Sequence, residues 1–160
     1  MGLILEIELF TQEHYKQSIA PDDNLSELFK DIFLFHWKEE TTHAMLDELE
    51  WERENAKISD DERDRAVDEL IALVVDIDGI LQSQSEADGD YFLKISGRSF
   101  TEDEIRQLKI GFLNAYRWQY IFSGVEHPRY QKMLTAVTNE AQRQRLIEAL
   151  ATLNEMVLPP

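Results

Sequence analysis

The spacing of apolar residues constrains the fold of this chain more than any other feature. Leucine, isoleucine, valine and phenylalanine recur at intervals of three and four residues through most of the sequence, which matches the turn of an α-helix. No stretch alternates apolar and polar residues with the period of two that a half-buried β-strand shows. Only six glycines and four prolines interrupt the pattern over 160 residues. The sequence therefore predicts an all-α protein.

Residues with strong capping preferences predict where the helices begin and end. Ser59 and Thr101 each stand three residues before a glutamate, which is the pattern of an N-terminal capping box. Gly97 is suited to end one helix and Ser123-Gly124 to break another. The predicted helices cover about residues 3–19, 25–56, 59–95, 101–122, 130–137 and 139–156. Because the connections are short, we expect sequential neighbours to pack antiparallel in one bundle of five to six helices over residues 1–160.

The charge of the chain limits the partners that it can bind. The sequence holds 32 acidic and 16 basic residues, for a formal net charge of -16. This balance repels nucleic acid and anionic membrane surfaces, and no basic stripe with interleaved aromatic residues offsets it. We therefore expect neither nucleic acid nor membranes among the partners of the protein.

The sequence also predicts the compartment. Cysteine is absent, which excludes disulfides, thiolate metal ligands and a cysteine nucleophile. No run of about 18 apolar residues predicts a membrane-spanning helix. The first residues follow a helical pattern without the basic region of a signal peptide. These features predict a cytoplasmic protein.

The second predicted helix carries four polar residues along one stripe. His36, Glu40, His43 and Asp47 are spaced by four, three and four residues, which keeps their side chains on one face of a helix. The surrounding apolar residues are numerous enough to bury much of this helix: Phe29, Ile32, Phe33, Phe35, Trp37, Met45, Leu46 and Leu49. Buried carboxylates and imidazoles are costly unless they are paired, protonated or bound to a metal. Glu40, His43 and His36 are therefore candidate metal ligands.

Counting residues from the turns indicates which side chains face Glu40. The first turn centres near residue 22, so Glu40 lies opposite residues 4 to 6, where Glu6 is the nearest carboxylate. The second turn centres near residue 59 and places Asp76 or Asp78 at the same level, and Asp78 fits the apolar face better. This estimate predicts a layer that contains Glu6, Glu40, His43 and Asp78.

Each of these residues also has a purely structural explanation. Glu40 and His43 can form an ion pair within the helix, worth a few tenths of a kcal/mol. His36 can be an ordinary half-buried histidine, and Asp47 can point to solvent. Two cations of the fourth predicted helix offer Asp78 a partner, Arg117 and Lys109.

The step Glu40-Thr-Thr-His43 resembles the metal-binding motif of the ferritin-like di-iron carboxylate superfamily. The resemblance implies a single glutamate from one helix and a Glu-x-x-His step from its antiparallel partner, followed by the same pair again. Glu6 matches the single glutamate, and the likeness covers the first two predicted helices. It implies iron or manganese as the cofactor, and oxygen-dependent oxidation of a small molecule or of iron itself.

The chain departs from that family in two respects. A second Glu-x-x-His is missing, since the corresponding part of the fourth predicted helix reads Asn114-Ala-Tyr-Arg117. The long crossover between the two hairpins is missing as well. Three interpretations stay open: a homodimer completes the site at its interface, the site is mononuclear or degenerate, or the chain corresponds to the later part of a longer ferritin-like protein. A non-enzymatic helical interaction or oligomerisation module is the alternative function.

Overall fold

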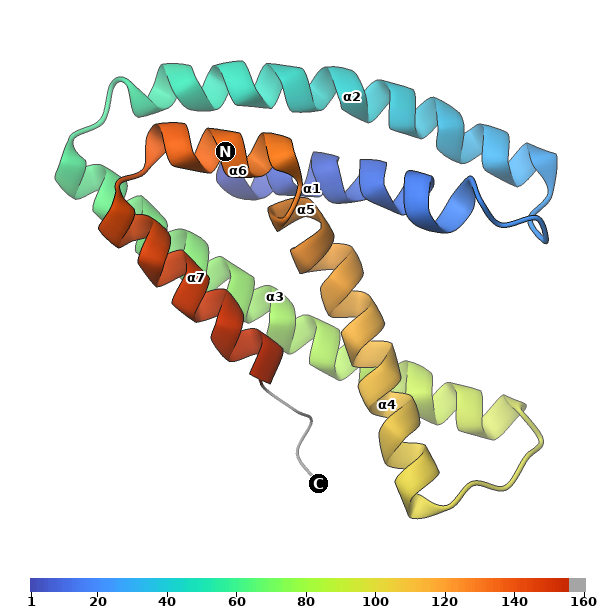
Figure 1. Ribbon diagram of the computed structural model, residues 1–160. Coiled ribbons are helices and arrows are strands. Elements are labelled where there is room, and N and C mark those ends of the chain that lie inside the picture. Colours follow the sequence, from blue (N-terminus) through green and yellow to red (C-terminus); the bar gives the residue numbers. More distant parts are fainter. Residues whose placement is uncertain (156–160) are drawn as a thin grey trace.

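The computed structural model describes residues 1–155, and these form helices joined by turns and loops, with no strand among them. The prediction of an all-α protein is therefore confirmed. Two short π-helical turns, η1 and η2, extend α1 and α4 (Figure 1). The elements are α1 Gly2–His14, η1 Tyr15–Ile19, α2 Glu27–Asn55, α3 Asp60–Ile95, α4 Glu102–Arg117, η2 Trp118–Phe122, α5 Ser123–Val125, α6 Pro128–Val137 and α7 Glu140–Glu155. None of these helices has the length and apolar character that crossing a bilayer requires.

The caps that the sequence predicts determine both ends of α3 and the start of α4. Ser59 accepts a hydrogen bond from the backbone N–H of Glu62, whose carboxylate accepts one from the backbone of Ser59. Thr101 and Glu104 form the same capping box at α4. Gly97 follows α3 with a φ of 64°, a conformation that glycine adopts without strain.

The predicted break at Ser123-Gly124 is wrong. The backbone stays helical through both residues to Val125, and the chain turns only before α6. Gly124 is needed for close packing instead, because a Cβ atom there would lie 2.5 Å from Oε1 of Glu6. The predicted end of the last helix at Met156 lies outside the described residues, as does Pro159-Pro160.

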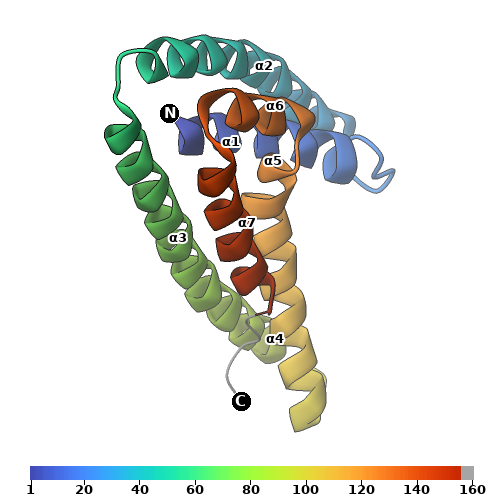
Figure 2. The same ribbon diagram turned by 60° about the vertical axis from the view of Figure 1, so that its left-hand side comes forward.

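The helices form two groups that share one interior. In the first, α1 and α2 run antiparallel as a hairpin, with α5 and α6 against it (Figure 1). In the second, the long α3 packs against α7 along its first half and against α4 along its second half. We expected α2 and α3 to pack antiparallel, but they diverge from the short connection between them (Figure 2). The reason is that α2 uses its inner face on α1 and α6, whereas α3 uses its own on α4 and α7.

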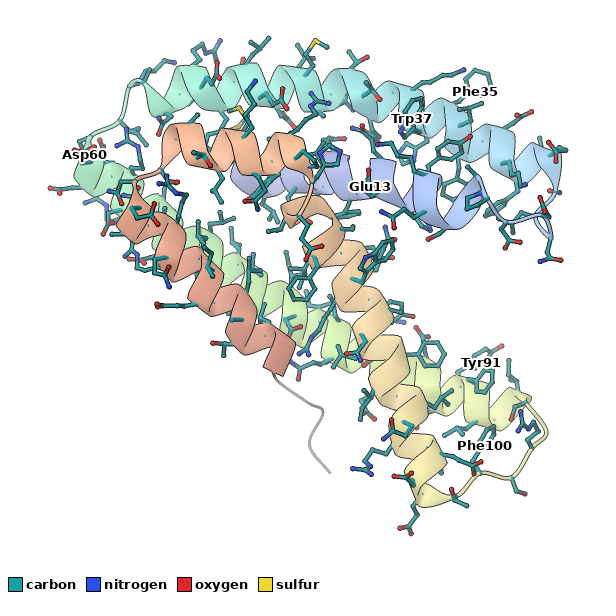
Figure 3. All side chains as sticks on the ribbon, in the orientation of Figure 1. Glu13, Phe35, Trp37, Asp60, Tyr91 and Phe100 are labelled. Atoms are coloured by element: carbon teal, nitrogen blue, oxygen red, sulfur yellow. The ribbon has the colours of Figure 1, made fainter. Side chains whose placement is uncertain are left out.

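The core lies between the two groups of helices. Its larger cluster of buried residues draws on α1, α2, α3, α6 and α7: Leu5, Leu9, Ala44, Val67, Tyr130, Met133, Leu134, Val137 and Leu146. Only Ala44 represents α2 in this cluster. Phe35 points away from α1 and is 67% exposed, while Trp37 points toward it (Figure 3). The expectation that the apolar residues of α2 bury much of that helix is therefore wrong, because the helix lies at the edge of the molecule.

Candidate metal centre

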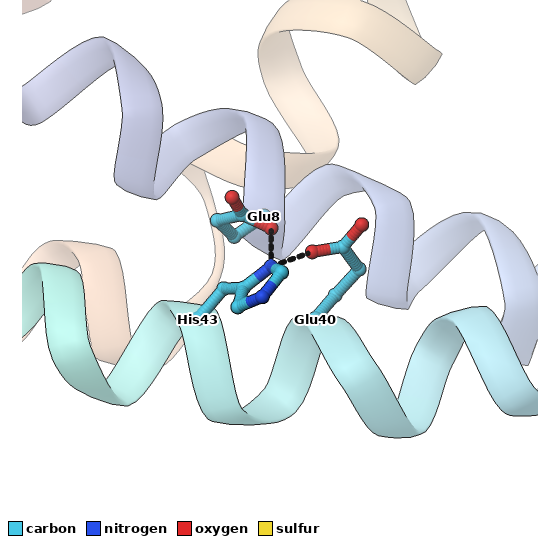
Figure 4. Close-up of side chains that lie close together, drawn as sticks. All are labelled: Glu8, Glu40 and His43. Carbon is cyan, nitrogen blue, oxygen red and sulfur yellow. Dashed lines mark hydrogen bonds and ion pairs between the residues drawn. The ribbon is translucent and has the colours of Figure 1, made fainter.

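Three potential ligands meet where α1 and α2 run side by side. Glu8 comes from α1, and Glu40 and His43 come from adjacent turns of α2 (Figure 4). One ligand atom from each of the three lies within 4.8 Å of the other two. Nδ1 of His43 is 2.8 Å from Oε2 of Glu40 and 3.9 Å from Oε2 of Glu8. A carboxylate, a second carboxylate and an imidazole thus face one point.

The packing of α1 explains why Glu8 takes part. Leu5, Leu9 and Gln12 lie three and four residues apart and point into the interior. Glu8 lies beside this row, at the boundary between the buried face and solvent. The side-chain amide of Gln12 donates a hydrogen bond to the backbone carbonyl of Glu40 over 3.3 Å, which holds the two helices in register at this level.

The two carboxyl groups hold one proton between them at neutral pH. Burial, the hydrogen bond to Glu40 and the charge of Glu40 together raise the pKa of Glu8 to about 8. Burial also acts to raise the pKa of Glu40, but its hydrogen bonds with Glu8 and His43 outweigh that effect and lower it. The hydrogen bond to Glu40 raises the pKa of the His43 imidazole. The lowered pKa of Glu40 and the raised pKa values of Glu8 and His43 thus favour a negative charge on Glu40 and protons on the other two groups.

The other two residues of the polar stripe flank this group. Nε2 of His36 forms an ion pair with Oε1 of Glu40 at 2.5 Å. Asp47 is half-buried rather than directed to solvent, and its Oδ2 atom is buried without a hydrogen-bond partner. Burial accordingly raises the pKa of the Asp47 carboxyl. Asp47 lies one turn beyond His43 and adds another oxygen donor to this face.

The structure places Glu6 elsewhere. Glu6 is 4% exposed and packs against Gly124, on the face of α1 that turns away from Glu40. Burial raises its pKa to about 9, so the side chain is a neutral carboxylic acid at neutral pH. The register estimate was correct to within a turn, but it carried no information on which face of α1 meets α2. Considering every carboxylate within one turn of the estimated level would have included Glu8.

Asp78 is also outside the group, in the interface between α3 and α4. Its two carboxylate oxygens accept hydrogen bonds from Nε and Nη2 of Arg117 at 2.6 and 2.9 Å. Gln82 donates a third bond, also at 2.6 Å, to Oδ2. Asp78 therefore has the cationic partner that we considered as the alternative to metal binding.

The group lies on an open face of the α1/α2 hairpin. The side chains of His36 and His43 are 46% and 47% exposed. Apolar residues one turn away on the same faces are exposed as well, Ile4 before Glu8 and Ile32 before His36. The ligand group and the apolar residues around it are therefore accessible to solvent.

The donor set suits one transition-metal ion. Carboxylate and imidazole groups are ligands that iron and manganese accept, and three protein donors leave positions for water or a substrate. The unpartnered oxygen of Asp47 adds to the acidity of the face. The described part of the chain brings no second Glu-x-x-His to this place, so one chain offers half of a di-iron ligand set.

Comparison with models of protein families, with characterised proteins and with solved structures finds no match to this chain. The functional argument therefore depends on the geometry of the site.

Proposed function

We propose that this protein binds iron or manganese through Glu8, Glu40 and His43. The observation that supports this most directly is the convergence of three ligand atoms from two helices within 4.8 Å. A purely structural ion pair between Glu40 and His43 needs no third group. Glu8 adds a second carboxyl to a place that already holds an anion, which is unfavourable unless a cation or a proton lies between them.

Protons and a metal ion compete for this site. The raised pKa of Glu8 and the raised pKa of His43 both describe protons that a metal ion would displace. Metal affinity is therefore expected to increase as the pH rises from 6 to 8.5. When bound, an iron or manganese ion supplies Lewis acidity and a change of oxidation state. Glu8, Glu40 and His43 hold it, and the half-exposed face lets a small molecule approach.

The likeness to ferritin-like proteins suggests the reaction class, oxygen-dependent oxidation of a small molecule or of iron. The ligand types support a more general point. Two anionic carboxylates and a neutral imidazole stabilise the higher charge of an oxidised metal ion. The proposal is accordingly a metal-dependent oxidase or oxygenase, with metal binding as its first step.

Equilibrium dialysis with Mn²⁺ tests that first step. We expect one ion per chain at pH 8, and a loss of affinity of about tenfold or more in Glu40→Gln and in His43→Ala. Glu39→Gln and His14→Ala are matched controls, since neither residue belongs to the group, and both should bind as the wild type does. Binding far below one ion per chain, or equal binding by all four variants, overturns the proposal.

The second copy of a homodimer is the partner that would complete the ligand set. The open face carries Glu8, Glu40 and His43 at its centre and apolar side chains around them. Ile32 and Ile4 at its border are 58% and 47% exposed, which is costly for an isolated chain. Two such faces related by a two-fold axis bring six ligands together. Because both faces are acidic, we expect the dimer to require the metal ion.

Analytical ultracentrifugation with and without Mn²⁺ tests the dimer. We expect a monomer in chelator and a dimer with metal, and Ile32→Asp should remain monomeric in both conditions. Lys38→Asp is the control, because it also makes the charge more negative but lies on the side of α2 away from the ligands. A dimer that forms equally well in chelator and in His43→Ala supports the alternative function, a non-enzymatic oligomerisation module.

A further inference from the structure

A cavity of about 290 Å³ opens where the two groups of helices meet, away from the candidate metal centre. The beginnings of α1 and α3 and the ends of α2 and α6 form its walls. Most of the lining is apolar, with Leu3, Trp51, Val67, Leu70, Leu73 and Val137 as its main residues. For scale, an apolar protein cavity of about 150 Å³ holds a benzene ring.

Two polar residues of the lining, Arg63 and Asn55, are bonded to each other, and a third, Glu54, pairs with Lys57. Nε of Arg63 donates to Oδ1 of Asn55 over 2.7 Å, and Nη2 donates to the backbone carbonyl of Asn55. Nη1 of Arg63 pairs with Asp60 at 2.5 Å. A charged ligand would have to displace these contacts, whereas an uncharged one would not.

The cavity continues inward along Leu70 toward a buried acid. A smaller space of about 20 Å³ shares Leu3 and Leu70 with the main cavity, and Glu6 and Tyr130 form its inner end. Both side chains are almost fully buried, at 4% and 3% exposure. Oε1 of Glu6 has no hydrogen-bond partner. A space of this size has room for one water molecule or for the polar end of a ligand.

The buried acid is suited to an uncharged oxygen group. A second small space, of about 30 Å³, borders Tyr130 and Leu134 on the other side of Leu70. Leu70 lines all three spaces, which therefore follow one seam along α3. The buried Oε1 atom of Glu6, which has no hydrogen-bond partner, is an acceptor for a hydroxyl group at the inner end of this seam. The other residues that line the two small spaces are apolar or aromatic.

We propose that this seam binds a small, uncharged and mainly hydrocarbon molecule whose single hydroxyl group donates a hydrogen bond to Glu6. The apolar walls take the hydrocarbon part, and the acid at the inner end orients it. Glu6 and Glu8 point to different faces of α1, so this site does not depend on the proposed metal centre. It is separate from the proposed function.

Two matched probes, 1-naphthol and naphthalene, test the site by equilibrium dialysis. We expect one saturable site per chain for both, and about tenfold higher affinity for 1-naphthol, the effect of one net hydrogen bond. Absence of saturable binding, or equal affinity for the two probes, overturns the proposal.

Variants then locate the bound probe. Leu70→Trp fills the seam and should lower the affinity for both probes at least about tenfold. Ala66→Phe reaches the same cavity from an exposed helix position, and therefore keeps the test decisive if Leu70→Trp does not fold. Leu28→Trp, on the exposed side of α2, is the control. Glu6→Leu should keep naphthalene binding and abolish the preference for 1-naphthol; an unchanged preference overturns the role given to Glu6.

Discussion

Asp78 and Glu40 are carboxylates on the two longest helices of this molecule, and their surroundings differ. Asp78 lies between α3 and α4, where the guanidinium of Arg117 binds both of its oxygens. Glu40 lies on the open side of the α1/α2 hairpin, where two histidines and a second carboxyl surround it. Their side chains are 2% and 13% exposed.

The comparison separates a structural charge from an available one. A fixed guanidinium compensates Asp78 permanently, and no other cation can replace it without unfolding the interface. Titratable protons compensate Glu40, and a metal ion can displace them at neutral pH. Substitutions at the Asp78–Arg117 pair should therefore mainly reduce stability. Substitutions around Glu40 should mainly reduce metal binding.

The largest expected effect is at the structural pair. Arg117→Met removes the cation and leaves the Asp78 carboxylate buried without its charge partner. We expect a loss of about 3–5 kcal/mol in the free energy of unfolding, measured by urea denaturation. The double variant Asp78→Leu/Arg117→Met should recover most of that loss, since it leaves no buried charge. A single variant as stable as the wild type would show that the pair is not compensated as the structure indicates.

The next largest effect is the pH dependence of stability that arises from the buried carboxyl group of Glu6. Its pKa of about 9 in the folded protein is above the ordinary value of 4.5, so the folded state holds a proton that the unfolded state releases. The contribution of Glu6 to the free energy of unfolding is therefore complete below about pH 4.5, and it decreases as the pH rises toward 9. Between pH 6 and 8.5 we expect Glu6 to contribute a loss of about 3 kcal/mol, since each unit is worth about 1.4 kcal/mol.

Glu6→Gln isolates this contribution, because the amide is neutral at every pH. Glu8 acts in the same direction with its pKa of about 8, so the variant should retain a smaller slope. An identical decline in the variant and the wild type would assign the whole pH dependence to other groups. Urea denaturation of metal-free protein at the two pH values gives the measurement.

A smaller effect is expected where α5 packs against Glu6. In Gly124→Ala the new methyl group would lie 2.5 Å from Oε1 and 2.6 Å from the backbone oxygen of Glu6. We expect a loss of about 1–3 kcal/mol, the usual cost of overpacking. Gly111→Ala is the matched control, since nothing lies within 4 Å of a Cβ atom there. This helical glycine should gain stability on substitution, by about 0.5–1 kcal/mol. Similar melting temperatures for both variants would contradict the close approach of α5 to α1.

The smallest effect on stability is expected at the candidate metal centre. His43→Ala removes a half-exposed side chain whose ion pair with Glu40 spans three residues on one helix. The metal-free variant should unfold within about 0.5 kcal/mol of the wild type, although it loses metal binding. A loss of several kcal/mol would place His43 with Arg117 among the structural residues and remove the contrast between the two regions.

Local patterns in the sequence predicted the helices and half of the candidate site. The capping boxes at Ser59 and Thr101 were predicted correctly because all of their hydrogen bonds lie within one turn. The closeness of Glu40 and His43 follows in the same way from a spacing of three residues. Gly124 shows the limit of such patterns: glycine commonly ends a helix, but here it admits a carboxylate from another helix.

The sequence by itself determined the class of fold, the capped starts of α3 and α4 and the polar stripe of α2, because these depend on residues within one or two turns of each other. Only the tertiary structure decided that Glu8 rather than Glu6 faces Glu40, that Arg117 neutralises Asp78, and that α2 leaves its apolar side exposed. Each of these depends on the rotation of one helix against another. The whole of the packed interior sets that rotation, and a difference of two residues along α1 moves a carboxyl group from the candidate metal centre to the buried seam.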